Sequence, residues 1–208
     1  MELFIMIFGA LFSIMNPFGT VPIFVSLTQE NSKLERNKIA FWTSLNVLII
    51  LLISYFAGKF ILLFFGISLN ALKIAGGLII ASSGFALLIG EFTKHKGMKK
   101  EKVKEDIKNR SEISLTPLAI PMIAGPGTIS LLITYNQEYD GLNNILIILG
   151  AIVVSTIFIY LILKSSYLIV KTLGASGINA LSRIIGFIVI AIGIEFIISA
   201  VVSIFKIV

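Results

Sequence analysis

Long stretches without a charged residue divide this chain, and they restrict it to very few folds. Uncharged runs cover residues 3–29, 39–58, 113–137 and 141–163. Two further apolar segments carry one charge each, Lys73 within residues 69–90 and Glu195 within residues 184–205. Each segment reaches or exceeds the roughly 20 residues that a helix needs to cross a bilayer core. The sequence therefore predicts an all-α, polytopic membrane protein with six transmembrane helices.

The basic residues are unevenly distributed between the two sides of the predicted membrane. Six crossings put three loops opposite the termini, residues 29–38, 92–112 and 164–183, which hold 3, 8 and 3 of the 17 Lys and Arg residues. Because basic loops stay in the cytoplasm, we expect a multi-pass cell-membrane protein with these loops cytoplasmic and both termini outside. We expect no nucleic-acid partner, since no aromatic or groove-reading residues accompany the basic cluster.

An internal repeat relates the two halves of the chain. The segment FGISLNALKIAGGLIIASSG, residues 65–84, resembles LGASGINALSRIIGFIVIAIG, residues 173–193. With one inserted residue, the shared positions include Gly66 with Gly174, Asn70 with Asn179, Gly77 with Gly186 and Gly84 with Gly193. The alternative to a duplication is a chance match of apolar residues.

The repeat, if a duplication, fixes the domain organisation. Three crossings per copy is an odd number, so the second copy must run through the membrane in the reverse direction. We therefore predict two inverted three-helix repeats, residues 1–91 and 113–208, joined by a charged cytoplasmic linker at residues 92–112. Inverted repeats of this kind build many secondary transporters, in which the solute binds near the bilayer midplane.

The opening crossing of each half is interrupted near its middle. Asn16-Pro17-Phe18-Gly19 interrupts the first crossing, and Ala124-Gly125-Pro126-Gly127 interrupts the fourth at the corresponding place. Proline removes a backbone donor and clashes with the preceding turn, and glycine adopts backbone angles that other residues avoid. The sequence therefore predicts that the first and fourth helices are broken near the midplane.

The two predicted breaks form a candidate binding site, because backbone freed from a helix cannot face lipid and must lie against protein or water. The second half-helices would offer free N–H groups and a positive dipole end, which suit a carboxylate, and loose carbonyl groups would suit an ammonium group or a cation. These residues are small or polar and favour a compact zwitterion. The predicted substrate-binding residues are Asn16, Pro17, Gly19, Thr20, Ala124, Gly125, Pro126, Gly127 and Thr128. The alternative is a pair of proline kinks that serves only helix packing.

Four other polar positions stand out within the apolar segments. Asn70 and Asn179 occupy matching places near the start of the third and sixth crossings, where they would cap a helix or line a pore. Glu195 lies near the centre of the sixth crossing, where a carboxyl normally faces the protein interior. It would make a polar contact inside the bundle or carry a coupling proton. Lys73 is expected to extend its ammonium group to the membrane interface.

Chemistry that requires metals or reactive side chains is not indicated. The chain has no cysteine, and its one histidine, His95, lies in the charged segment 92–112. The sequence contains no nucleophile–base pair, phosphate-binding loop or metal-ligand cluster. We therefore expect no enzyme activity, no cofactor and no metal site.

Four segments carry a resemblance to a known family. The segments MNPFGTVPIFVSLT, ALKIAGGLIIASSG, PLAIPMIAGPGTIS and LSRIIGFIVIAIGIEFI resemble the hallmark segments of the MarC family of integral membrane proteins, and the likeness extends over nearly the whole chain. The resemblance implies six transmembrane helices, distant kinship with LysE-type exporters and, for some members, uptake of glycine and alanine coupled to an ion gradient. The family often has glutamine where this chain has Glu195.

Together, the breaks and the resemblance predict a secondary transporter of small neutral amino acids. Its partners would be the solute, a coupling cation (a proton or sodium), the lipid bilayer and, as a homo-oligomer, further copies of the chain. Two alternatives stay open: an exporter of amino acids or other small metabolites on the same scaffold, and a channel-like membrane protein without coupled transport.

Overall fold

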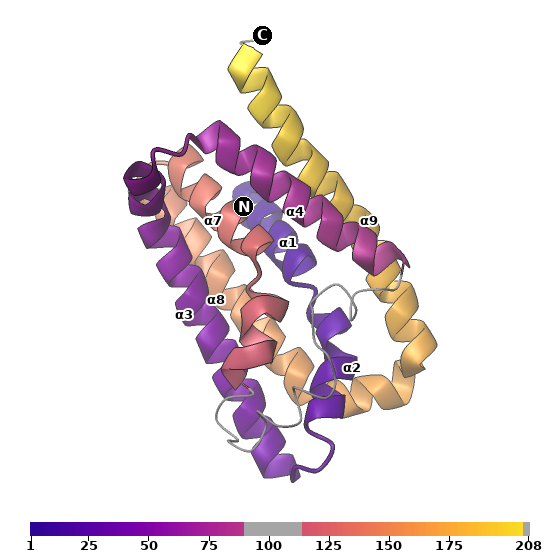
Figure 1. The fold of residues 1–208 in the computed structure, drawn as a ribbon. Helices are drawn as coiled ribbons and strands as arrows, with labels where there is room; N and C mark the ends of the chain where they lie inside the picture. Colours follow the sequence, from indigo (N-terminus) through magenta and orange to yellow (C-terminus); the bar gives the residue numbers. More distant parts are fainter. Residues whose placement is uncertain (90–113, 206–208) are drawn as a thin grey trace.

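The computed structural model describes residues 1–89 and 114–205, and within these ranges every regular element is a helix (Figure 1). The elements in chain order are α1 (Glu2–Met15), α2 (Pro17–Leu27), α3 (Lys33–Phe65), α4 (Leu69–Ile89), the π-helix η1 (Ser114–Ile123), α7 (Pro126–Glu138), α8 (Leu142–Lys164) and α9 (Ser166–Phe205). The predicted all-α class is confirmed. The predicted linker, residues 92–112, and His95 lie outside the described residues.

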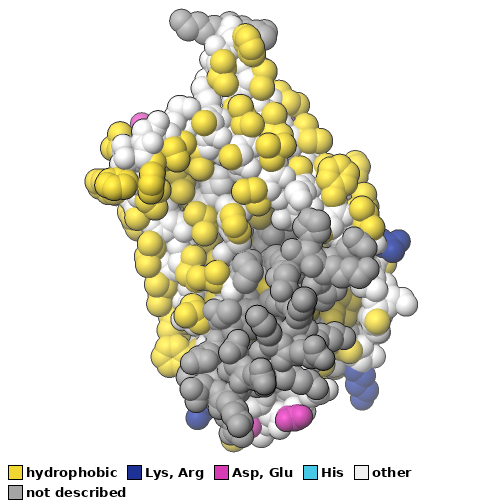
Figure 2. Space-filling model, viewed as in Figure 1, with side chains coloured by type: hydrophobic (Ala, Val, Ile, Leu, Met, Phe, Trp, Pro, Cys, Tyr) yellow, Lys and Arg dark blue, Asp and Glu magenta, His cyan; other side chains and the backbone are white. Residues whose placement is uncertain are grey.

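Five stretches of helix in the described residues are long and apolar enough to cross a membrane: Glu2–Leu27, which contains α1 and α2, together with α3, α4, α8 and α9. The fourth crossing predicted from the sequence is divided between η1 and α7, and neither piece is long enough alone. Hydrophobic side chains are spread over the upper and left parts of the visible face, and most of the visible charged groups lie at its right edge and lower end (Figure 2). Such a surface suits contact with lipid.

Local signals explain where α3 begins and ends. The Glu35 backbone N–H donates to Ser32 Oγ at 3.3 Å, and the Ser32 N–H donates to Glu35 Oε2 at 2.8 Å. This reciprocal capping box starts α3. At the other end Gly66 adopts a left-handed conformation, with φ of 64°, which glycine accepts without steric cost.

The glycine that matches Gly66 in the repeat acts in a similar way. Gly174 also has a φ of 64° and interrupts the helical backbone of α9. A straight helix of the 40 residues in α9 would be about 60 Å long, twice the thickness of a bilayer core. The bend at Gly174 therefore separates a short leading segment from the long part of α9, which lies beside α4 (Figure 1).

The contact between α4 and α9 is the most extensive in the fold. Glycines make it close: a Cβ atom added to Gly77 would lie 2.5 Å from the Gly193 carbonyl oxygen, and one added to Gly193 would lie 2.6 Å from the Gly77 oxygen. Gly84 and Gly186 have the same relation, at 2.7 and 2.8 Å. Small residues let membrane helices approach until their backbones touch. The two helices therefore pack backbone against backbone.

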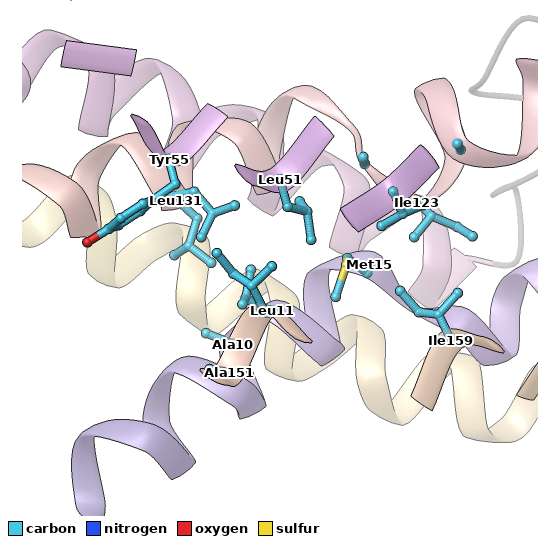
Figure 3. Packing of buried hydrophobic residues seen from close by; sticks show 14 of the residues in the cluster. Ala10, Leu11, Met15, Leu51, Tyr55, Ile123, Leu131, Ala151 and Ile159 are labelled. Carbon is cyan, nitrogen blue, oxygen red and sulfur yellow. The ribbon is translucent and has the colours of Figure 1, made fainter. Parts of the chain in front are cut away.

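The main buried cluster lies at the meeting point of α1, α3, η1, α7 and α8 (Figure 3). Its large members include Leu11, Leu51 and Leu131, each fully buried. Met15 at the end of α1 and Ile123 at the end of η1 belong to the same cluster. The ends of both half-helices that precede a break thus reach the centre of the molecule.

Candidate functional site

The first break falls at Asn16, between α1 and α2. Asn16 has φ 41° and ψ 66°, a left-handed conformation that asparagine tolerates better than most residues. Its side-chain Oδ1 accepts a hydrogen bond from the Gly19 N–H at 3.2 Å. Pro17 occupies the first turn of α2, where its missing N–H costs nothing. Asn16 therefore ends one helix and caps the next.

The second break has a different backbone. The Ala124 N–H donates to the Ala119 carbonyl at 2.9 Å, the spacing of a π-helix. Gly125 then adopts an extended conformation, with φ −83° and ψ 173°, and Pro126 begins α7. Proline keeps the residue before it out of helical angles. Asn16 has a positive φ, whereas the extended angles of Gly125 are open to any residue. The second break therefore follows from Pro126.

Most of the predicted binding residues are buried. Asn16 and Thr128 are each 1% exposed and Thr20 is 0% exposed. The Thr20 hydroxyl donates to the Asn16 carbonyl at 3.4 Å, and the Thr128 hydroxyl donates to the Ile123 carbonyl at 3.5 Å. Pro17, Ala124 and Gly127 are also buried, Gly19 and Gly125 are half-buried, and Pro126 is exposed.

One donor in the first break is unsatisfied. The Asn16 Nδ2 atom is buried and has no hydrogen-bond partner among the described residues. A buried amide donor without a partner carries a desolvation penalty of about 1–3 kcal/mol. A ligand atom that accepts a hydrogen bond would remove this penalty.

The two breaks come together in space through the residues beside them. A Cβ atom added to Gly127 would lie 2.8 Å from Ile80 of α4 and 3.7 Å from Ile14 of α1, two residues before Asn16. Met15 and Ile123, which precede the two breaks, belong to the same buried cluster (Figure 3). The structure therefore joins segments that are more than a hundred residues apart in the sequence.

Comparison with known proteins places the chain in a family. A family model described as MarC family integral membrane protein matches residues 1–205. The chain belongs to this family. Its relatives include a UPF0056 membrane protein of Buchnera aphidicola subsp. Schizaphis graminum, 40% identical over 99% of this chain and 94% of the relative.

Relatives in other organisms agree. A UPF0056 membrane protein of Methanocaldococcus jannaschii is 36% identical over 97% of each chain, and the UPF0056 inner membrane protein MarC of Citrobacter koseri is 33% identical over 92% of this chain and 90% of the relative. No solved structure gives a significant match. The relatives' names and the apolar helices together identify a multi-pass membrane protein.

Two predicted caps of this MarC family protein need correction. The cap of α4 is Ser68, whose Oγ accepts from the Ala71 N–H at 3.2 Å. Asn70 instead donates from Nδ2 to Ser203 Oγ of α9 at 3.4 Å. Asn179 lies within α9, beyond the bend at Gly174, and its side chain is exposed. Neither asparagine caps a helix, because each lies inside the helix it was expected to begin.

Glu195 does not face the interior of the bundle as expected. Its side chain is exposed on α9, because the glycine two residues earlier, Gly193, faces α4. Two residues turn about 200° around a helix, so Glu195 points to the opposite side. The predicted polar contact inside the bundle is therefore wrong for the described chain.

Lys73 is buried instead of extending to the interface. Its Nζ atom forms an ion pair with Glu138 Oε1 at the end of α7, at 2.5 Å. Glu138 is not among the residues predicted from the sequence, although a lone lysine within an apolar crossing is itself a signal for a buried partner. The pair ties α4 to α7, which also meet where the Ser130 hydroxyl donates to the Leu72 carbonyl at 3.3 Å.

Proposed function

We propose that this MarC family protein is a secondary transporter of small neutral amino acids such as glycine and alanine, driven by an ion gradient. The observation that carries the proposal is the meeting of two broken helices at the buried centre, with the Asn16 amide donor unsatisfied. The N-terminal ends of α2 and α7 would attract the solute carboxylate. Carbonyl groups at the ends of α1 and η1 would take its ammonium group or a coupling cation, a proton or sodium.

The glycine contacts support two inverted repeats, residues 1–91 and 113–208. In the sequence repeat Gly77 corresponds to Gly186 and Gly84 to Gly193. In space the partners are exchanged: Gly77 touches Gly193, and Gly84 touches Gly186. An exchange of this kind is what a two-fold axis between equivalent units produces. This relation favours a true duplication over a chance match of apolar residues.

Four other helix contacts follow the same exchange. In the first half α1 packs on α8, and in the second half η1 packs on α3. Similarly, α2 packs on α9 and α7 packs on α4. We infer that η1 and α7 together form a fourth crossing that corresponds to α1 and α2. The chain would then cross the membrane six times, with loops 29–38, 92–112 and 164–183 cytoplasmic and both termini outside.

The packing at the breaks favours a compact solute and a cycle of conformations. Gly127 lies against Ile80, and Gly19 lies against the Asn16 side chain, so the described conformation leaves little room beside either glycine. A solute would enter after one repeat moves against the other, as in alternating access around a central site. Because the residues at the breaks are small, glycine and alanine fit this role better than bulky amino acids.

Uptake of labelled glycine and alanine into liposomes containing the purified protein tests the proposal. We expect saturable uptake that depends on an imposed proton or sodium gradient. Gly127→Leu should abolish this uptake, because the new side chain would occupy the space next to Ile80 and Ile14. Gly9→Ala is the control, because a Cβ atom at Gly9 has no neighbour within 4 Å.

The outcomes separate the alternatives. Folded Gly127→Leu protein with undiminished uptake would exclude the breaks as the site. Flux that does not saturate and ignores the gradient would instead indicate a channel-like protein. Counterflow with the gradient reversed would address the direction of transport and so the alternative of an exporter on the same scaffold.

A further inference from the structure

A second polar site lies away from the breaks, where the end of α3 meets the end of α7 and the start of α8. A cleft of about 380 Å³ opens there, and its polar lining includes Tyr55, Lys59, Asn136, Gln137 and Asp140. We call it the α3–α7 cleft. Its volume lies at the lower end of the roughly 300–1,000 Å³ found for small-molecule sites.

The α3–α7 cleft holds two opposite charges that do not neutralise each other. Lys59 and Asp140 both line it, and neither forms an ion pair within the described residues. Both side chains are exposed, where charges of opposite sign gain little from pairing with each other, so both groups stay available to a ligand. A ligand with an anionic and a cationic end would satisfy both groups at once.

Neutral hydrogen-bonding groups line the same cleft. The Tyr55 side chain is 0% exposed, and its hydroxyl lies beside the Asn136 side chain without a well-formed hydrogen bond among the described residues. In Figure 3 this hydroxyl points away from the apolar cluster. The amides of Asn136 and Gln137 line the same cleft and are joined by a hydrogen bond of 3.0 Å from Gln137 Nε2 to Asn136 Oδ1. The cleft therefore offers donors and acceptors as well as both charges.

A layer of apolar side chains separates the α3–α7 cleft from the breaks. Along α7, Thr128 at the break and Asn136 at the cleft are eight residues apart, which is about 12 Å in a helix. Leu11, Leu51 and Leu131 are fully buried in the central cluster that extends from Tyr55 to Met15 (Figure 3). A polar solute cannot cross this layer unless the helices move.

We propose that the α3–α7 cleft is a separate binding site for zwitterionic α-amino acids, in which Lys59 binds the carboxylate and Asp140 binds the ammonium group. The site receives the solute on the side of the chain termini. The solute reaches the breaks only after the layer of apolar side chains, which includes Leu11, Leu51 and Leu131, has opened. The identity of the solute rests on the proposed function, whereas the charge pattern of the cleft does not.

Thiol protection provides a test that does not depend on transport. The chain has no cysteine, so Gln137→Cys creates a single reactive thiol inside the cleft. In purified protein in detergent, L-alanine should slow the reaction of this thiol with a maleimide about ten-fold at ten times its dissociation constant, by mass action. Asn143→Cys is the matched control, since Asn143 is exposed on the nearby first turn of α8 but does not line the cleft.

Charge variants identify the groups that bind. Lys59→Gln and Asp140→Asn, each in the Gln137→Cys background, should raise the alanine concentration needed for protection about ten-fold, the loss expected for one charge-assisted hydrogen bond. Acetate and methylamine, which carry one charge each, should protect far less than alanine. Glu2→Gln, which removes an exposed charge outside the cleft, should change nothing.

The results distinguish this inference from the proposed function. Amino acid uptake without protection, or protection that is unchanged in both charge variants, would overturn the cleft site and leave transport standing. Protection that requires both charges in a protein without uptake would support the cleft and refute transport.

Discussion

Replacing Gly193 by alanine inserts one methyl group between α4 and α9, where the structure leaves no space for it. The new Cβ atom would lie 2.6 Å from the Ala81 nitrogen, 2.6 Å from the Gly77 oxygen and 3.0 Å from the Ala81 Cα atom. All three neighbours are backbone atoms, so no side chain can rotate away. Because ordinary contact begins at 3.4 Å, the two helices must separate by about 0.8 Å locally.

Two opposing effects set the size of the loss. Overpacking of a close contact costs about 1–3 kcal/mol, and backbone neighbours on both helices put this site at about 3 kcal/mol. Alanine improves helix propensity over glycine by about 1 kcal/mol. The expected net loss is about 2 kcal/mol in the free energy of unfolding. For a chain of this length, it corresponds to a fall in Tm of about 4–8 °C.

The thermal unfolding of purified protein in detergent, followed by circular dichroism, measures this effect. Gly9→Ala is the control, because no atom lies within 4 Å of its added Cβ. The control keeps the gain in helix propensity and makes no clash, so its Tm should stay the same or rise. If Gly193→Ala and Gly9→Ala change Tm in the same direction, the close backbone contact between α4 and α9 does not exist.

A double variant tests whether the two glycines share one contact. Gly77→Ala places its Cβ 2.5 Å from the Gly193 oxygen. Once the first methyl group has separated the helices, the second finds more space. The combined loss should therefore be smaller than the sum of the single losses, by about 1 kcal/mol or more. Strict additivity would indicate that the two substitutions act at independent places.

Three further predictions concern charge and topology. Glu138→Gln leaves the buried Lys73 ammonium without its carboxylate. Because Glu138 is one-third exposed, we expect the free energy of unfolding to fall by about 2 kcal/mol, less than the 3–5 kcal/mol of a fully buried pair. The Tm of the double variant Lys73→Met/Glu138→Gln should lie closer to that of the wild type than the Tm of Glu138→Gln does. Glu195→Gln should leave the pH dependence of alanine uptake unchanged, since Glu195 points away from the bundle; a shifted profile would favour proton coupling. In intact cells a membrane-impermeant maleimide should label Asn143→Cys and spare Asn31→Cys, and the reverse pattern would invert the topology.

The class of protein and the places where helices break depend on properties local to the sequence. An uncharged run of about 20 residues is long enough to cross a bilayer, and three of the four charge-free runs lie in long helices, whereas residues 113–137 are divided between η1 and α7. Pro17 and Pro126 interrupt helices because a missing N–H and a restricted preceding residue act within one turn. Gly66 and Gly174 occupy matching positions of the repeat, and both have a φ of 64°.

The partner of each side chain depends on how the helices are rotated and joined in space. Lys73 and Glu138 are 65 residues apart and pair only because α4 and α7 pack together. Glu195 points outward because Gly193 is held against α4. The α3–α7 cleft collects Lys59 and Asp140 from separate segments. Periodicity along the sequence shows that a helix has two sides, but the packing of its neighbours decides which side is buried.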